Sequence, residues 1–141
     1  MSFESIKNTD AHSTHPRACV IFSAFSPSEL KQLKNVARLS GISEQIVIDG
    51  SYNATKLLDL LENPSLTPEK TEHTLTQKAL LFNNIPANRM HAFIENMKKC
   101  RIPRPLIAVV TETSIHWTLE ELINNLAAER IALKNNQTTL H

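Results

Sequence analysis

The hydrophobic pattern of the first half of the chain returns in the second half at a nearly constant spacing. At an offset of 60 residues both positions are apolar in the pairs Phe22 with Phe82, Phe25 with Ile85, Leu30 with Met90, Leu33 with Phe93, Ala37 with Met97 and Ile42 with Ile102. At an offset of 65, after a longer loop, the pairs are Tyr52 with Trp117, Leu57 with Leu122, Leu58 with Ile123 and Leu61 with Leu126. Self-similarity of this kind is typical of an internal duplication. The sequence therefore predicts two diverged copies of one unit, residues 17–62 and 77–133.

Each unit has the pattern of a strand, a helix, a second strand and a second helix. Short apolar or β-branched runs predict the strands: residues 18–24, 45–49, 79–83 and 106–111. Strands separated by a helix cannot form a hairpin, so each pair should be parallel and joined by a right-handed crossover. We expect one α/β domain of two βαβα repeats, with a four-stranded, mainly parallel sheet covered by helices. A mixed sheet with a pseudo-twofold axis is the alternative.

The expected helices begin at recognisable capping sequences. Ser26, Pro27 and Glu29 combine an N-cap, a proline at the first helical position and a capping-box acid, and Thr118 to Glu121 form a second capping box. An apolar residue before each helix can pack on the fourth helical residue as a hydrophobic staple. The predicted staples are Phe25 with Leu30, Tyr52 with Leu57, Ile85 with Met90 and Trp117 with Leu122. An apolar stripe of Met90, Phe93, Ile94, Met97 and Cys100 predicts core packing by the first helix of the second unit.

Polar segments flank and divide the predicted domain. Residues 1–16 and 134–141 indicate tails, and residues 63–76, which contain two prolines, indicate a linker between the repeats. A chain of 141 residues that is 41% hydrophobic suffices for one core. No apolar run has the length of a signal peptide or a membrane span, so we expect a cytoplasmic protein whose Cys19 and Cys100 stay reduced.

Composition argues against several classes of function. Lys and Arg number 15 against 14 Asp and Glu, so a nucleic-acid partner is not expected, although a local basic patch is compatible with this balance. Only two glycines occur, and neither belongs to a phosphate-binding loop. His12 and His15 have a helical spacing but no third ligand nearby. We therefore predict no cofactor, no metal and no catalytic residues.

The segment VVTETSIHWTLEELINNLAAER, within residues 77–133, resembles the small bacterial domain-of-unknown-function family 3783. The resemblance is carried by Thr111, Thr113, Trp117, Leu119, Leu122 and Glu129. This family has no established activity, so the resemblance implies none. The first half is similar to a degenerate copy, in which Tyr52 replaces the tryptophan and the threonine loop is shorter.

The loop 111–117 is the leading candidate site, because ligands of open parallel sheets bind beyond the carboxyl ends of strands and near helix N-termini. Its candidate residues are Thr111, Thr113, Ser114, His116 and Trp117. Their hydroxyl groups could bind an anion, or could instead satisfy their own backbone.

A basic cluster of Lys98, Lys99, Arg101 and Arg104 either binds an anionic partner or complements a helix C-terminus. The sequence predicts a non-enzymatic interaction or regulatory module that meets a protein partner or its own copy. The alternative is a domain that uses this loop to bind a small molecule or anion, with catalysis left open.

Overall fold

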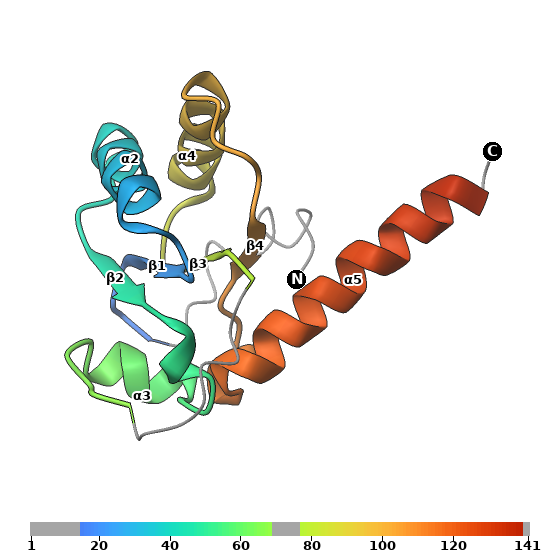
Figure 1. Cartoon of the computed structure of the whole chain (residues 1–141). Helices are drawn as coiled ribbons and strands as arrows, with labels where there is room; N and C mark the ends of the chain where they lie inside the picture. The colour runs from blue at the N-terminus through green and yellow to red at the C-terminus, as the bar shows by residue number, and fades with distance from the viewer. Residues whose placement is uncertain (1–14, 69–76, 140–141) are drawn as a thin grey trace.

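A computed structural model describes residues 15–68 and 77–139, and the burial of side chains up to Leu133 (Figure 1). Its elements follow one another as β1 (Cys19–Ser23), α2 (Pro27–Leu39), β2 (Gln45–Ile48), the 3-10 helix η1 (Gly50–Tyr52), α3 (Leu57–Glu62), β3 (Ala79–Asn83), α4 (Ala87–Lys99), β4 (Leu106–Val109), the 3-10 helix η2 (Ser114–His116) and α5 (Leu119–Thr139). The four strands occupy the four predicted runs. Of the predicted tails and linker, residues 1–14, 69–76 and 140–141 lie outside the description, and α5 continues into residues 134–139.

The four strands form one sheet in the order β2-β1-β3-β4. β1 is parallel to β2 and β3 is parallel to β4, but the central pair β1 and β3 is antiparallel. The α/β class is confirmed, whereas the prediction of a mainly parallel sheet is wrong and the mixed alternative is the observed one. The crossover rule constrains only strands joined through a helix within one unit. It does not determine how β1 and β3, which are buried along their whole length, meet each other.

The central strand pair is centred on two residues that lie 60 positions apart. Ile21 is opposite Leu81, and the flanking pairs are Val20 with Phe82 and Phe22 with Leu80. Exchanging each residue with the one 60 positions away leaves this set of pairs unchanged. The two apolar strands therefore form the middle of the sheet with equivalent registers.

A second contact between the halves joins the starts of α3 and α5. The amide of Leu57 donates to Trp117 O over 3.0 Å, and the amide of Leu119 donates to Thr55 O over 2.9 Å. These two hydrogen bonds map onto each other when the residues of the two halves are related by an offset of 62. That offset relates Leu57 to Leu119 instead of Leu122. Three residues are close to one helical turn, so the apolar pattern matches almost as well in the shifted alignment.

Two hydrophobic clusters lie on opposite faces of the sheet. Val20 and Phe22 of β1 pack with α2 and α4, whereas the intervening Ile21 packs with α3 and the first half of α5. Figure 1 shows α2 and α4 beside each other and α3 on the other side, with α5 extending away from the sheet. Because alternate residues of a strand face opposite sides, a strand buried on both faces must be apolar throughout.

Both predicted capping boxes are present. The Ser26 amide donates to Glu29 Oε1 over 2.9 Å and the Glu29 amide donates to Ser26 Oγ, and Thr118 and Glu121 exchange the same bonds before α5. These bonds satisfy amides that a helix start otherwise leaves open.

Three of the four predicted staples have the required position before their helices, and the one at Tyr52 is wrong. The N-cap of α3 is Lys56, so Tyr52 lies too far upstream to be the residue that precedes the cap. Tyr52 instead ends η1, and its hydroxyl donates to Leu66 O over 3.1 Å. The intervening 3-10 helix displaces the start of α3 beyond the position that the apolar pattern predicts.

The two cysteines occupy opposite environments. Cys19 is buried in β1, and burial, reinforced by the nearby negative charge of Glu44, raises the pKa of its thiol to about 12. Cys100 is exposed, so its predicted packing on the apolar stripe is wrong. The helix ends at Lys99, and Arg101 turns the chain with a φ of 58°.

Candidate functional site

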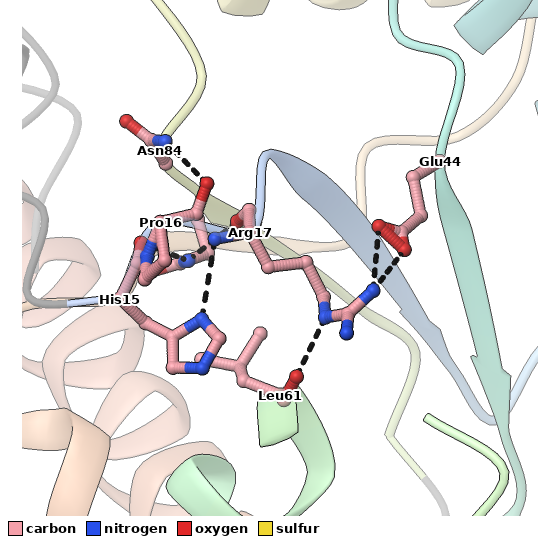
Figure 2. A network of polar contacts seen from close by, with 7 residues as sticks. His15, Pro16, Arg17, Glu44, Leu61 and Asn84 are labelled. Atoms are coloured by element: carbon pink, nitrogen blue, oxygen red, sulfur yellow. Dashed lines mark hydrogen bonds and ion pairs between the residues drawn. The ribbon is translucent and has the colours of Figure 1, made fainter. Parts of the chain in front are cut away.

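Arg17 connects three elements of the first half at the end of the sheet where β1 and β2 begin (Figure 2). Its Nη1 donates to both carboxylate oxygens of Glu44 over 2.9 and 2.6 Å, and its Nε donates to Leu61 O over 2.6 Å. Arg17 precedes β1, Glu44 precedes β2, and Leu61 lies near the end of α3. This guanidinium is thereby occupied by structural contacts.

The residues before β1 are also held by two asparagines at the end of β3. Asn83 is fully buried, and its Nδ2 donates to Arg17 O over 2.7 Å and to His15 O over 3.2 Å. Asn84 donates to Pro16 O over 2.8 Å, as Figure 2 shows. His15 Nδ1 accepts the Arg17 amide over 3.2 Å. These contacts fix residues 15–17 across the end of β3.

The loop 111–117 is closed by hydrogen bonds between its own residues. The Thr111 amide donates to Ser114 Oγ over 2.9 Å, and the Ser114 amide donates to Thr111 Oγ1 over 3.1 Å. Ser114 is fully buried and begins η2, whereas Thr113 and His116 are exposed. Trp117 is half-buried against the core on the α3 and α5 side. Two of the five candidate residues thus satisfy their own backbone, in keeping with the structural interpretation.

The mixed sheet also weakens the geometric reason for choosing this loop. Parallel strands would bring all four carboxyl ends to one edge, where ligands of open α/β sheets bind. Because β1 is antiparallel to β3, the carboxyl ends of β1 and β2 lie at one end of the sheet and those of β3 and β4 lie at the other. The loop after β4 therefore lies at the same end of the sheet as the end of β3 and the start of β1, where residues 15–17 are bound.

Replacing Ser114 with alanine should lower the free energy of unfolding by about 1 to 3 kcal/mol, because the amide and the hydroxyl of Thr111 both lose their buried partner, Ser114 Oγ. Thr113→Ala, at an exposed position one residue earlier, is the matched control and should change stability by less than about 0.5 kcal/mol. Urea unfolding followed by circular dichroism measures both variants. Equal stabilities would contradict the structural role of the Ser114 hydroxyl.

A concave groove lies elsewhere, between α2 and the start of β2. Its volume is about 620 Å³, and its lining residues are Lys31, Lys34, Asn35, Arg38, Gly41, Ile42, Ser43 and Gln45. The sheet is less completely covered here than on the other side of the molecule. Val47, opposite Phe22, is 41% exposed, whereas Val109, opposite Phe82, is 6% exposed. α4 therefore covers β4 more fully than α2 covers β2.

Three cations of α2 line this groove. Lys31, Lys34 and Arg38 recur at intervals of three and four residues, which places them on one helix face. No aspartate or glutamate is among the described residues that line the groove. Arg38 donates to Asn35 Oδ1 over 2.5 Å, and neither lysine has an ion pair within the described part of the chain.

The carboxylates that flank this row in sequence are already paired. A hydrogen bond from Lys78 to Glu29, 2.5 Å long, lowers the pKa of the Glu29 carboxyl, and Glu44 is bound by Arg17. The groove consequently presents positive charge that these acids do not neutralise.

This row is not apparent as a cluster in the linear sequence. Lys98, Lys99, Arg101 and Arg104 were predicted as the basic cluster because they lie close together in sequence, and all four are exposed at and after the end of α4. Cations spaced by three and four residues lie side by side only once the helix forms. A helical projection of residues 27–39 would have revealed the row.

The comparison with protein families concerns the second half of the chain. Residues 78–133 match the family Domain of unknown function (DUF3783). The matched DUF3783 segment spans β3, α4 and β4, the loop 111–117 and the first part of α5. The groove residues 31–45 lie entirely outside it. No curated protein and no solved structure matches the chain.

Two absences apply to the described residues. No group of three or more His, Cys, Asp or Glu side chains is placed to hold a metal ion, and the predicted His12 lies outside this part of the chain. Among residues 15–68 and 77–139, no helix combines the length and the hydropathy needed to cross a membrane.

Proposed function

We propose that this chain is a non-enzymatic interaction module that binds an anionic protein partner in the groove between α2 and β2. The observation that carries the proposal is the row of Lys31, Lys34 and Arg38, which lines a concave surface without an acidic residue among its described lining. Complementary charge increases both the association rate and the specificity of such an interface. The proposal assumes a cytoplasmic setting, in which both thiols stay reduced.

The partner class follows from the amount and location of charge. Nucleic-acid binding by phosphate neutralisation normally requires a larger basic excess than the net charge of +1 in this chain. A patch of three cations is sufficient for a few carboxylates of a protein. We assign the loop 111–117 a structural role, since the Thr111 and Ser114 hydroxyls bind each other.

We also propose that the two halves descend from one repeated unit and that the first half acquired the basic row afterwards. The proposal is supported by the central register around Ile21 and Leu81 and by the offset of 60 in the apolar pattern. At that offset the row corresponds to His91, Ile94 and Lys98, and Ile94 is buried. The second half could not present the same row without disturbing its core.

The decisive experiment removes three charges at each of two places. We expect the variant Lys31→Gln, Lys34→Gln, Arg38→Gln to bind a fluorescein-labelled poly-L-glutamate peptide at least about tenfold more weakly than the wild type. The charge-matched control is Lys98→Gln, Lys99→Gln, Arg101→Gln, which should change the Kd less than about threefold. Fluorescence anisotropy measures the Kd at low and high salt, and the difference should shrink as salt screens the charges.

Equal effects of the two triple variants would show that net charge, not the groove, binds the peptide, and would overturn the proposal. Folding is a small concern because all six side chains are exposed. Circular dichroism of each variant checks it.

A further inference from the structure

We propose that the anionic partner binds as an extended acidic segment that adds to the sheet as a fifth strand beside β2. This inference rests on the proposed function, because the cations of α2 would hold the acidic side chains of that segment. Addition of a strand to an exposed edge is a general mode of peptide recognition.

The backbone of β2 presents open hydrogen-bonding groups on its outer side. The amides of Val20 and Ala24 donate to Glu44 O over 3.1 Å and to Ile48 O over 3.2 Å, so these carbonyls point toward β1. Successive residues of a strand direct their backbone groups to alternate sides. Gln45 and Val47 therefore direct their amides and carbonyls outward, where no strand of the described chain pairs with them.

The other edge of the sheet is better protected. Pro105 directly precedes β4 and Pro103 lies two residues before that, and Ile107 and Val109 of the strand pack against the α2 and α4 core. Proline and covered side chains are common ways of protecting sheet edges. β2 contains no proline, and its Val47 is 41% exposed. An added strand would gain backbone hydrogen bonds at β2, and its side chains on the α2 face would cover Val47.

The basic row has a length that suits an extended segment. With a rise of about 1.5 Å per helical residue, Lys31 and Arg38 lie about 10.5 Å apart along the axis of α2. Side chains on one face of a strand repeat about every 6.8 Å, so two or three alternate acidic residues span a similar length. The helix of a βαβ unit packs lengthwise against its strands, so the row of cations on α2 extends alongside the free edge of β2. The expected motif is therefore an acidic residue at every second position.

Charge and geometry disfavour the two competing occupants. A second copy paired edge to edge through β2 would bring two rows of three cations together, and like charges at an interface cost several kcal/mol in general. A nucleic acid would use the cations but not the outward amides and carbonyls of Gln45 and Val47. The acidic segment uses both features.

The first test uses the peptide Ac-EVEVEVE-amide and two N-methylated forms of it. One form carries methyl groups on the valine amides, and the other carries them on the glutamate amides. In an added strand only one of these sets faces β2, so we expect one form to bind at least about tenfold more weakly and the other to keep the Kd of the parent within about threefold. Equal Kd values for the two methylated forms would overturn strand addition.

The second test changes the protein at the edge. Val47→Pro removes the outward amide, which an edge strand tolerates, and should weaken the parent peptide about tenfold. Val47→Thr keeps the amide and changes only part of the side-chain contact, so it should weaken the peptide less than about threefold. If Val47→Pro does not fold, the methylated peptides decide the question alone.

The outcomes separate this inference from the proposed function. If the triple variant of α2 loses the peptide while Val47→Pro and both methylated forms bind normally, the groove binds acids but not as a strand. If oligothymidylate binds more tightly than the parent peptide through the same three cations, the partner is a nucleic acid and strand addition is wrong. If the triple variant binds the peptide like the wild type, the proposed function itself fails.

Discussion

Replacing Phe93 with alanine should lower the free energy of unfolding by about 3 to 5 kcal/mol, the usual range for truncating a fully buried aromatic residue. The ring of Phe93 is 0% exposed. Its centroid lies 5.5 Å from that of Phe82 in an edge-to-face arrangement and 6.3 Å from that of Phe22. One side chain of α4 thus contacts both central strands, so its removal opens a cavity where the two halves share their core.

Urea unfolding followed by circular dichroism measures this loss. Leu39→Ala is the control, because Leu39 is also an apolar helix residue but is 65% exposed, and it should cost less than about 1 kcal/mol. A loss below about 1 kcal/mol for Phe93→Ala would mean that α4 does not pack on the sheet as described.

A second large effect is expected at the buried end of β3. Asn83→Asp should destabilise the protein by about 3 to 5 kcal/mol at pH 7. The Asn83 amide nitrogen donates to Arg17 O and His15 O, and an aspartate would direct a carboxylate oxygen at two carbonyl oxygens in a fully buried site. Both the lost donors and the buried charge oppose folding.

The same variant should have a stability that depends on pH in a defined direction. Burial and the facing carbonyls should raise the folded-state pKa of the new carboxyl above its unfolded value of about 3.9. Its stability relative to the wild type is therefore highest below about pH 4 and falls as the pH rises through the folded-state pKa. Urea midpoints of both proteins at pH 4 and pH 7 measure this difference.

Asn84→Asp provides a matched control for this effect. Asn84 is the next residue, is half-buried and makes one hydrogen bond to Pro16 O. Its positive φ of 55° is one that aspartate also tolerates, so this change should cost about 1 kcal/mol. Equal stabilities of Asn83→Asp and Asn84→Asp at pH 7 would contradict the buried role of Asn83.

Local features of the fold were predictable because they depend on neighbouring residues. The capping box of Ser26 and Glu29 joins residues only three positions apart, so the start of α2 is recorded in the sequence itself. The strands predicted at 79–83 and 106–111, which are observed at 79–83 and 106–109, were predictable for a similar reason, since a buried strand must be apolar over consecutive positions. Cys100 was misplaced because the periodic stripe does not indicate where α4 ends.

The candidate site was less predictable than the fold. Thr111 and Ser114 were selected for their hydroxyl groups, but only the folded loop shows that these groups bind each other. The basic row of α2 was missed because its members become neighbours only on the helix. Its functional setting also depends on β2 being an edge strand, which follows from the strand order.

The amino-acid sequence by itself determined where the four strands lie, where α2 and α5 begin, and that both halves share one apolar pattern. Short-range hydrogen bonds and hydrophobic periodicity encode these properties within a few residues of each other. Only the tertiary structure decided that β1 and β3 meet antiparallel, that β2 keeps an open edge, and that three cations face a groove there. Those outcomes depend on contacts between residues far apart in the chain, whose pairing direction no local pattern specifies.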